Sequence, residues 1–272
     1  MSGNVALIQS ARKLDGLHGL RAVAALAVVL FHLQRIPNLP LPSWLSSVTG
    51  DAYLSVHLFF VISAFSLFHS SRYAPANYSA YLVKRFFRIA PLFYAMLAYM
   101  PWGGGVPGGQ ALVSNVTFTF NLMPGQEWSV VWAGWSVGVE MLFYLMLPGL
   151  LFLIRGWLGF LLLFLATATL SAVVWYMTTG APGLQENFAY FSLAGSMPSF
   201  SAGLLAYRIF KSAAVRRRRD RWRVMLALTF GLLLLIAFFD PPGLHAHAFG
   251  FYFAFLVLPS RAVRVGAACD PG

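Results

Sequence analysis

Charged residues and cysteine are both scarce in this sequence. Only 10% of its 272 residues are charged, whereas a soluble domain carries about a quarter. This shortage argues against a soluble protein. The single cysteine, Cys269, excludes a disulfide, an iron–sulfur cluster or a cysteine-bound zinc site within one chain. We expect no metal.

The sequence is instead rich in long apolar segments. Hydrophobic residues make up 59% of the chain, and they come in long segments rather than alternating as in strands. Inside a bilayer the backbone must satisfy its own hydrogen bonds, which favours helices. We therefore predict an all-α protein, a single polytopic transmembrane helical bundle over residues 1–272 with about eight spans. The predicted spans are 19–36, 52–69, 87–101, 133–154, 157–177, 187–207, 224–239 and 246–260.

Acidic residues are also few, since eight of them face nineteen lysines and arginines, for a net charge of +11. Such a balance can indicate nucleic-acid binding, but in a membrane protein the basic residues gather in cytoplasmic loops. With both termini in the cytoplasm, eight spans leave only Arg35 outside. The run RRRRDRWR (216–223) then anchors the topology and meets anionic lipid headgroups, with nucleotide binding as the alternative. We expect the lipid bilayer as a partner and no nucleic acid.

The first predicted span carries two ionisable groups, Arg21 and His32, eleven residues apart. At about 100° per residue they lie on one helix face, roughly 16 Å apart along the axis. Ionisable groups within a span are costly and usually functional. This face is therefore expected to line a cavity, with Arg21 at its cytoplasmic mouth and His32 in the outer half. The alternative is that Arg21 reaches the inner headgroups and His32 is a packing residue.

Two further arginines, Arg85 and Arg88, lie three residues apart at the inner end of the third span, and so are neighbours on one helix face. Topology alone would account for basic residues there. It does not account for their pairing on one face with Pro91 a turn further in, where a helix can kink and free backbone groups toward a cavity.

Glu140 is the only acid within the apolar part of any predicted span, at a depth of roughly 10 Å. An unpaired carboxylate is costly at that depth, so a partner is expected. His32 lies at a similar depth and is the first candidate, with His57 and Asp51 as alternatives. The outer loop 102–132 is almost uncharged, and such a loop either lies among the headgroups or folds over a pocket.

Four stretches of the N-terminal half resemble, in the same order, the acyltransferase-3 family of membrane enzymes that O-acetylate bacterial glycans. They are LDGLHGLRAVAALAVVLFH (14–32), HLFFVISAFSLF (57–68), KRFFRIAPLFY (84–94) and WSVGVEMLFYLMLP (135–148). The resemblance implies an O-acetyltransferase of the bacterial inner (plasma) membrane that takes an acyl group, usually acetyl, from acyl-CoA. The acceptor would be a hydroxyl of a polysaccharide or of its lipid-linked precursor. The residues at the matching motif positions are Arg21, His32, Arg85, Arg88 and Glu140.

The sequence also departs from the family pattern. Ala64 stands where glycine is usual, which predicts crowding between helices. Three additional residues separate Asp15 from the arginine, which puts the usual role of Asp15 in doubt. The predicted spans are fewer than usual, and residues 260–272 are polar where another span could follow, as in a truncated or unusual member.

A mechanism follows from the predicted depths of these residues. The phosphates of acetyl-CoA would bind Arg85, Arg88 and Arg21 at the inner mouth, and the thioester would reach His32. There His32 removes a proton from the acceptor hydroxyl, while Glu140 orients the imidazole. Whether a covalent acyl-enzyme forms stays open, because the candidate serines are either nucleophiles or helix-packing residues. These serines are Ser63, Ser66 and Ser136.

Two other function classes remain open. A transporter is the main alternative, because proton-coupled carriers also place His, Glu and Arg inside the membrane. The sequence shows no repeated halves, however, which many carriers have. The other alternative is an inactive truncated relative that only scaffolds an assembly enzyme.

Overall fold

The computed structural model describes the helical core of the protein. The described residues are 15–35, 42, 52–69, 78–100, 108–154, 156–178 and 186–211. Within them the structure is all-helical, as predicted. The helices are α2 (Asp15–Gln34), η1 (Ala52–Leu54), α4 (Ser55–His69), α5 (Tyr78–Tyr99), α7 (Gly109–Val116), η3 (Phe120–Leu122), α8 (Trp135–Leu153), α9 (Gly156–Thr178), α10 (Glu186–Phe191) and α11 (Leu193–Lys211).

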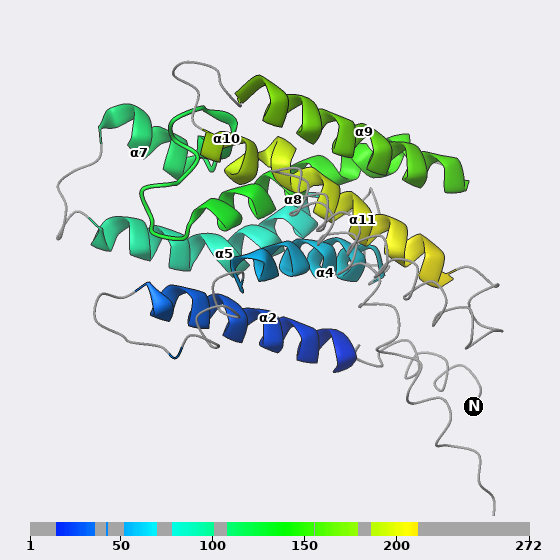
Figure 1. The fold of residues 1–272 in the computed structure, drawn as a ribbon, viewed down its shortest axis with the longest axis horizontal. Helices are drawn as coiled ribbons and strands as arrows, with labels where there is room; N and C mark the ends of the chain where they lie inside the picture. The colour runs from blue at the N-terminus through cyan, green and yellow to red at the C-terminus, as the bar shows by residue number, and fades with distance from the viewer. Residues whose placement is uncertain are drawn as a thin grey trace, which may run out of the picture.

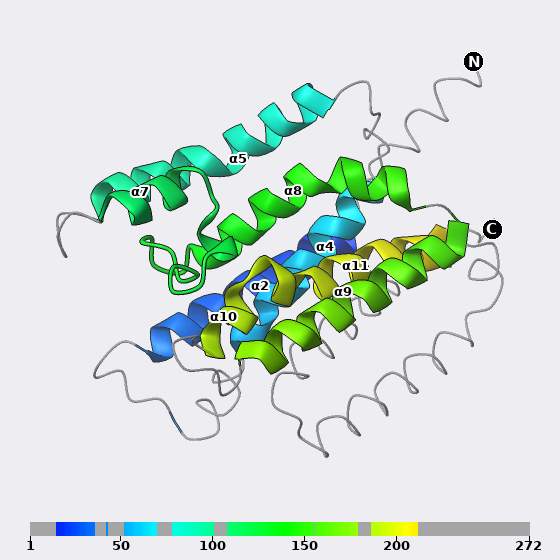
Figure 2. The ribbon, with the colours of Figure 1, turned by 90° about the horizontal axis from the view of Figure 1, so that it is seen from above.

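The long helices lie side by side, and each reverses the direction of the one before it (Figures 1 and 2). By length and apolar composition, three segments of the described chain can cross a membrane: Ala52–His69, Trp135–Leu153 and Gly156–Thr178. The predicted spans 224–239 and 246–260 lie outside the described residues. The total of eight spans and the cytoplasmic termini therefore stay predictions.

Two predicted spans differ from the helices that form. The third was expected to begin at residue 87, but α5 begins at Tyr78, so Arg85 and Arg88 lie within a helix. Hydropathy missed these first turns of α5 because basic residues break the apolar run although they suit a helix. The sixth is interrupted at Ser192, between α10 and α11. An added Cβ at Gly195 would collide with the carbonyl of Ala189, so this sharp bend requires glycine there.

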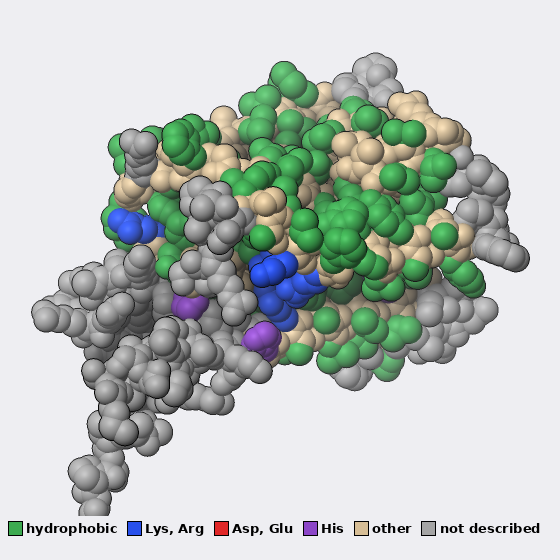
Figure 3. All heavy atoms as spheres, turned by 180° about the vertical axis from the view of Figure 1, so that it is seen from behind, with side chains coloured by type: hydrophobic (Ala, Val, Ile, Leu, Met, Phe, Trp, Pro, Cys, Tyr) green, Lys and Arg blue, Asp and Glu red, His purple; other side chains and the backbone are tan. Residues whose placement is uncertain are grey.

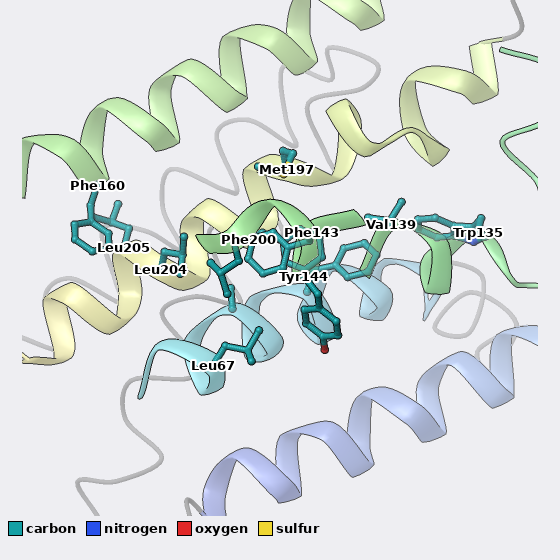
Figure 4. Packing of buried hydrophobic residues seen from close by; sticks show 13 residues of the cluster. Leu67, Trp135, Val139, Phe143, Tyr144, Phe160, Met197, Phe200, Leu204 and Leu205 are labelled. Carbon is teal, nitrogen blue, oxygen red and sulfur yellow. The ribbon is translucent and has the colours of Figure 1, made fainter. Parts of the chain in front are cut away.

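Helix α4 is the buried centre of the bundle. It packs between α2 on one side and α11 on the other, and α9 packs against α11. Aromatic rings join α4, α8 and α11, because Phe200 stacks on both Phe60 and Phe143, with ring centroids 4.6 Å and 3.9 Å apart. Figure 4 shows Phe143 and Phe200 in this apolar cluster. The cluster fixes α8 relative to α4.

The crowding expected at Ala64 is avoided by a glycine on the facing helix. Ala64 is fully buried, and its partner across the contact is Gly203 of α11. A Cβ added at Gly203 would lie 2.9 Å from the Ala64 Cβ and would also collide with the Val61 carbonyl. Small residues allow such close approach of helices in membranes.

We expect Gly203→Ala to lower the free energy of unfolding by about 1–3 kcal/mol, because overfilling a packed contact forces the helices apart. Thermal unfolding in detergent measures this. Gly149→Ala is the matched control, since a Cβ added there meets nothing within 4 Å beyond its chain neighbours and the backbone of its own helix. Equal melting temperatures for the two variants would contradict the close contact.

Candidate active site

Arg21 points from α2 toward α4. Its guanidinium Nη2 donates to the Ser66 hydroxyl over 3.3 Å. One turn later on the same face, Ala24 is buried against α4, so the packing of α2 places Arg21 at this helix contact. The guanidinium group of Arg21 is therefore held against α4 by this hydrogen bond and does not simply project toward the headgroups.

Three guanidinium groups gather at this point. Arg21 lies within electrostatic range of Arg85, Arg88 and Glu140. Arg85 also lies over two aromatic rings, with its Cζ 5.4 Å from the Tyr144 ring centroid and 5.8 Å from that of Tyr81. Arg88 is exposed. On the face of the molecule opposite to Figure 1, basic side chains form a compact group on a largely hydrophobic surface (Figure 3).

Glu140 has partners other than the one expected. Its Oε1 accepts a hydrogen bond from Ser63 over 2.8 Å and another from the Tyr144 hydroxyl. Figure 4 shows the Tyr144 hydroxyl pointing out of the apolar cluster, on the side where α2 lies. The expected pairing of Glu140 with His32 is wrong, because the described structure contains no hydrogen bond between these two side chains. Ser63 donates from the facing helix α4, and Tyr144 donates from one turn along α8. These two hydroxyls are the hydrogen-bond partners of the carboxylate in place of His32.

His32 lies at the other end of α2, among aromatic rings. Its ring centroid is 4.6 Å from that of Trp132 and 5.3 Å from that of Phe31. The guanidinium of Arg35 covers Phe31, 4.5 Å from its centroid. Trp132 belongs to the loop before α8, which lies at the same end of the bundle as the end of α2 (Figure 2).

Residues 132–144 therefore lie beside both ends of the predicted site. Trp132 contacts His32, and further along the same stretch Glu140 and Tyr144 lie within electrostatic range of Arg21. Glu140 lies five residues beyond the start of α8 at Trp135, roughly 7.5 Å along the helix axis. The imidazole and the guanidiniums thus lie beside the same stretch of chain, the first at the loop and the second along the helix.

The loop before α8 is folded rather than spread out. Asn115 of α7 is buried and binds it, because its Oδ1 accepts from the Ser129 hydroxyl over 2.6 Å and from the Val130 amide over 3.0 Å. Gly138 of α8 receives the loop from the other side, where an added Cβ would collide with Asn121 and Phe120. The described part of this loop is therefore folded against the helices.

A cavity of about 390 Å³ lies between α5 and α8. Arg85 and Tyr144 are part of its wall, and neither Arg21 nor His32 lines it. The other lining residues are mostly apolar: Leu82, Phe86, Tyr94, Val116, Thr117, Phe118, Met141, Leu142 and Leu145. This cavity borders the basic group but is not the shared passage that the sequence predicts.

The remaining candidates have structural partners or lie outside the described residues. His57 is fully buried, and its Nδ1 is 2.9 Å from the Ser199 hydroxyl, so it joins α4 to α11. Asp51 lies outside the described residues, and so does the run 216–223. Tyr144 and Trp132 were not among the predicted site residues. The spacing of four residues between Glu140 and Tyr144 was a usable signal, but no pattern marks Trp132.

Comparison with known proteins matches the sequence to one family. A family model described as an acyltransferase domain matches residues 14–262. The exopolysaccharide production protein ExoZ of Rhizobium meliloti (strain 1021) is 30% identical over 111 residues. That alignment covers 38% of this chain and 35% of the relative, so the chain matches about a third of the relative's length. No solved structure matches the chain.

Proposed function

The chain belongs to the acyltransferase-3 family, and from this premise we propose that it moves an acetyl group from acetyl-CoA to a hydroxyl of a polysaccharide or of its lipid-linked precursor. Its place would be the bacterial inner membrane. The relative ExoZ carries exopolysaccharide production in its name, which supports a glycan as the acceptor class.

The grouping of Arg21 with two further arginines and one carboxylate, Glu140, is the observation that carries the proposal. Arg21, Arg85 and Arg88 share one electrostatic neighbourhood, and like charges held together are unfavourable without an anion. Glu140 forms no ion pair with them within 4 Å in the described structure. The phosphates of acetyl-CoA would supply the missing negative charge, because guanidinium donors match phosphate oxygens in pairs.

The chemistry would take place at His32. A ring nitrogen of His32 accepts the proton of the acceptor hydroxyl while the oxygen attacks the thioester carbonyl carbon. The C–S bond then breaks, the CoA thiolate leaves with the proton from the imidazolium, and the acceptor carries an ester. His32 and Arg21 are separated by roughly 16 Å along α2, a distance that the extended pantetheine arm of acetyl-CoA can bridge.

Glu140 has a different role in this proposal from that of a triad carboxylate. It accepts hydrogen bonds from Ser63 and Tyr144 and so holds α4 and α8 together beside the guanidiniums. Its charge offsets part of their mutual repulsion. Ser63 donates a hydrogen bond to Glu140, and Ser66 accepts one from Arg21. These bonds favour a packing and positioning role for the two serines over nucleophilic attack.

Transfer by the purified protein tests the proposal. The protein in lipid nanodiscs is given radiolabelled acetyl-CoA and surface polysaccharide from its host bacterium, stripped of esters by mild alkali. We expect alkali-labile label on the polysaccharide. Binding of acetyl-CoA without transfer would instead favour an inactive relative, and uptake of the label into sealed vesicles without covalent transfer would favour a carrier.

A further inference from the structure

We infer that Trp132 is the acceptor platform of the site, on which a sugar ring stacks with one hydroxyl directed at His32. This inference rests on the proposed function, since it assigns the acceptor side of the same site. It begins from an unusual juxtaposition. The indole of Trp132 contacts the imidazole of His32, yet 66% of Trp132 remains exposed.

The contact leaves most of the indole open to a ligand. The ring centroids of Trp132 and His32 are 4.6 Å apart with an interplanar angle of 59°, so the two rings are tilted and do not cover each other. An aromatic face is electron-rich, and the C–H groups along one face of a sugar ring carry slight positive charge. A sugar stacked on the indole would therefore present hydroxyl groups at its edge, beside the imidazole.

The backbone around Trp132 is constrained on both sides. Ser129 has a φ of 66° and Ala133 a φ of 59°, values in the left-handed region that residues with a Cβ seldom adopt. Such conformations persist only where the surroundings impose them, and they concentrate at ligand and catalytic sites. Here the Asn115 side chain holds the turn at Ser129 by accepting from Ser129 and Val130. Around Ala133, the Gly134 amide donates to the Val131 carbonyl over 2.8 Å. The loop thus holds the indole in a set position.

A membrane-interface role would explain an exposed tryptophan without any ligand, and the neighbouring Trp128 provides the comparison. Trp128 is 49% exposed and lies on the same loop. Its ring packs on Phe191, with centroids 4.2 Å apart, and makes no ring contact with His32 in the described structure. Trp132 differs from it in having the imidazole as its neighbour.

The test compares the two tryptophans in the transfer assay, with radiolabelled acetyl-CoA and alkali-treated host polysaccharide. Trp132→Ala should raise the KM for polysaccharide roughly five- to tenfold, as expected for loss of a stacked ring, with little change in the Kd for acetyl-CoA. Trp132→Phe should restore most of the affinity. Trp128→Ala is the matched control and should leave both constants unchanged.

The possible outcomes separate a failure of the Trp132 platform from a failure of the proposed acetyl transfer. An unchanged polysaccharide KM in Trp132→Ala would overturn the platform, as would an equal rise in Trp128→Ala. If Trp132→Ala does not fold, as judged by lost acetyl-CoA binding, Trp132→Phe and Trp132→Leu provide the comparison, and equal KM values for these two would also overturn it. Absence of transfer by the wild-type protein would overturn the proposed function itself.

Discussion

Replacing His32 with alanine should lower acetyl transfer by about 10²–10⁴-fold, the usual contribution of a positioned general base. The imidazole lies beside Trp132 at one end of α2, away from the group of arginines. Binding of acetyl-CoA, measured by titration calorimetry on the detergent-purified variant, should therefore change little. The loss should fall on the maximal transfer rate.

The control for this variant is another histidine on the same helix. His18 is exposed and has no part in the proposed chemistry, so His18→Ala should transfer acetyl at the wild-type rate. Both variants need to retain wild-type helicity by circular dichroism. Undiminished transfer by a folded His32→Ala protein would end the assignment of His32 as the base.

Replacing Arg88 with glutamine should weaken acetyl-CoA binding by about 10- to 100-fold. A hydrogen bond to a charged group contributes about 1.5–3 kcal/mol, which corresponds to that range of dissociation constants. Arg88 is exposed at the edge of the basic group, so it can meet a phosphate without rearrangement. The difference from wild type should shrink at high salt, since ions screen exposed charges.

Two further variants separate phosphate binding from net charge. Arg208→Gln removes the same charge from α11, where Arg208 lies over the Trp157 ring, 5.6 Å from its centroid, and it should bind acetyl-CoA normally. Arg88→Lys keeps the charge but loses the forked donor and should be intermediate. Equal affinity for Arg88→Gln and wild type would leave Arg88 with a topological role only.

Much of the helical framework could be predicted because hydrophobic length and helical periodicity are local properties. Arg21 was expected to face a polar neighbourhood, and α2 does direct it to Ser66 and the charges beyond. The partners of Glu140 were predicted less well. Depth alone made His32 a candidate, whereas Tyr144 lies one turn along the same helix and its spacing was a usable local signal. Ser63 could not be predicted, because only the packing of α4 against α8 brings it to the carboxylate.

The contact between Ala64 and Gly203 illustrates the same limit. Read along the chain, Ala64 was a departure that predicted crowding. Its compensation lies on a helix far away in sequence, and only the pairing of α4 with α11 connects the two. The loop before α8 was harder still, because Phe118, Ser129 and Ala133 adopt left-handed conformations there beside Gly125, and sequence rules expect glycine at such positions.

Those left-handed residues have a consequence for how the protein would respond to heat. The segment between Ser129 and Ala133 is held by two hydrogen bonds to the Asn115 Oδ1, one bond within the turn and the buried Val131 side chain. The helices are secured by more extensive packing that includes stacked aromatic rings. Regions with fewer restraints open first as thermal energy rises. The proposed transfer of acetyl to a glycan should therefore decrease on warming while the helical bundle is still folded. Binding of acetyl-CoA should persist to a higher temperature than transfer does.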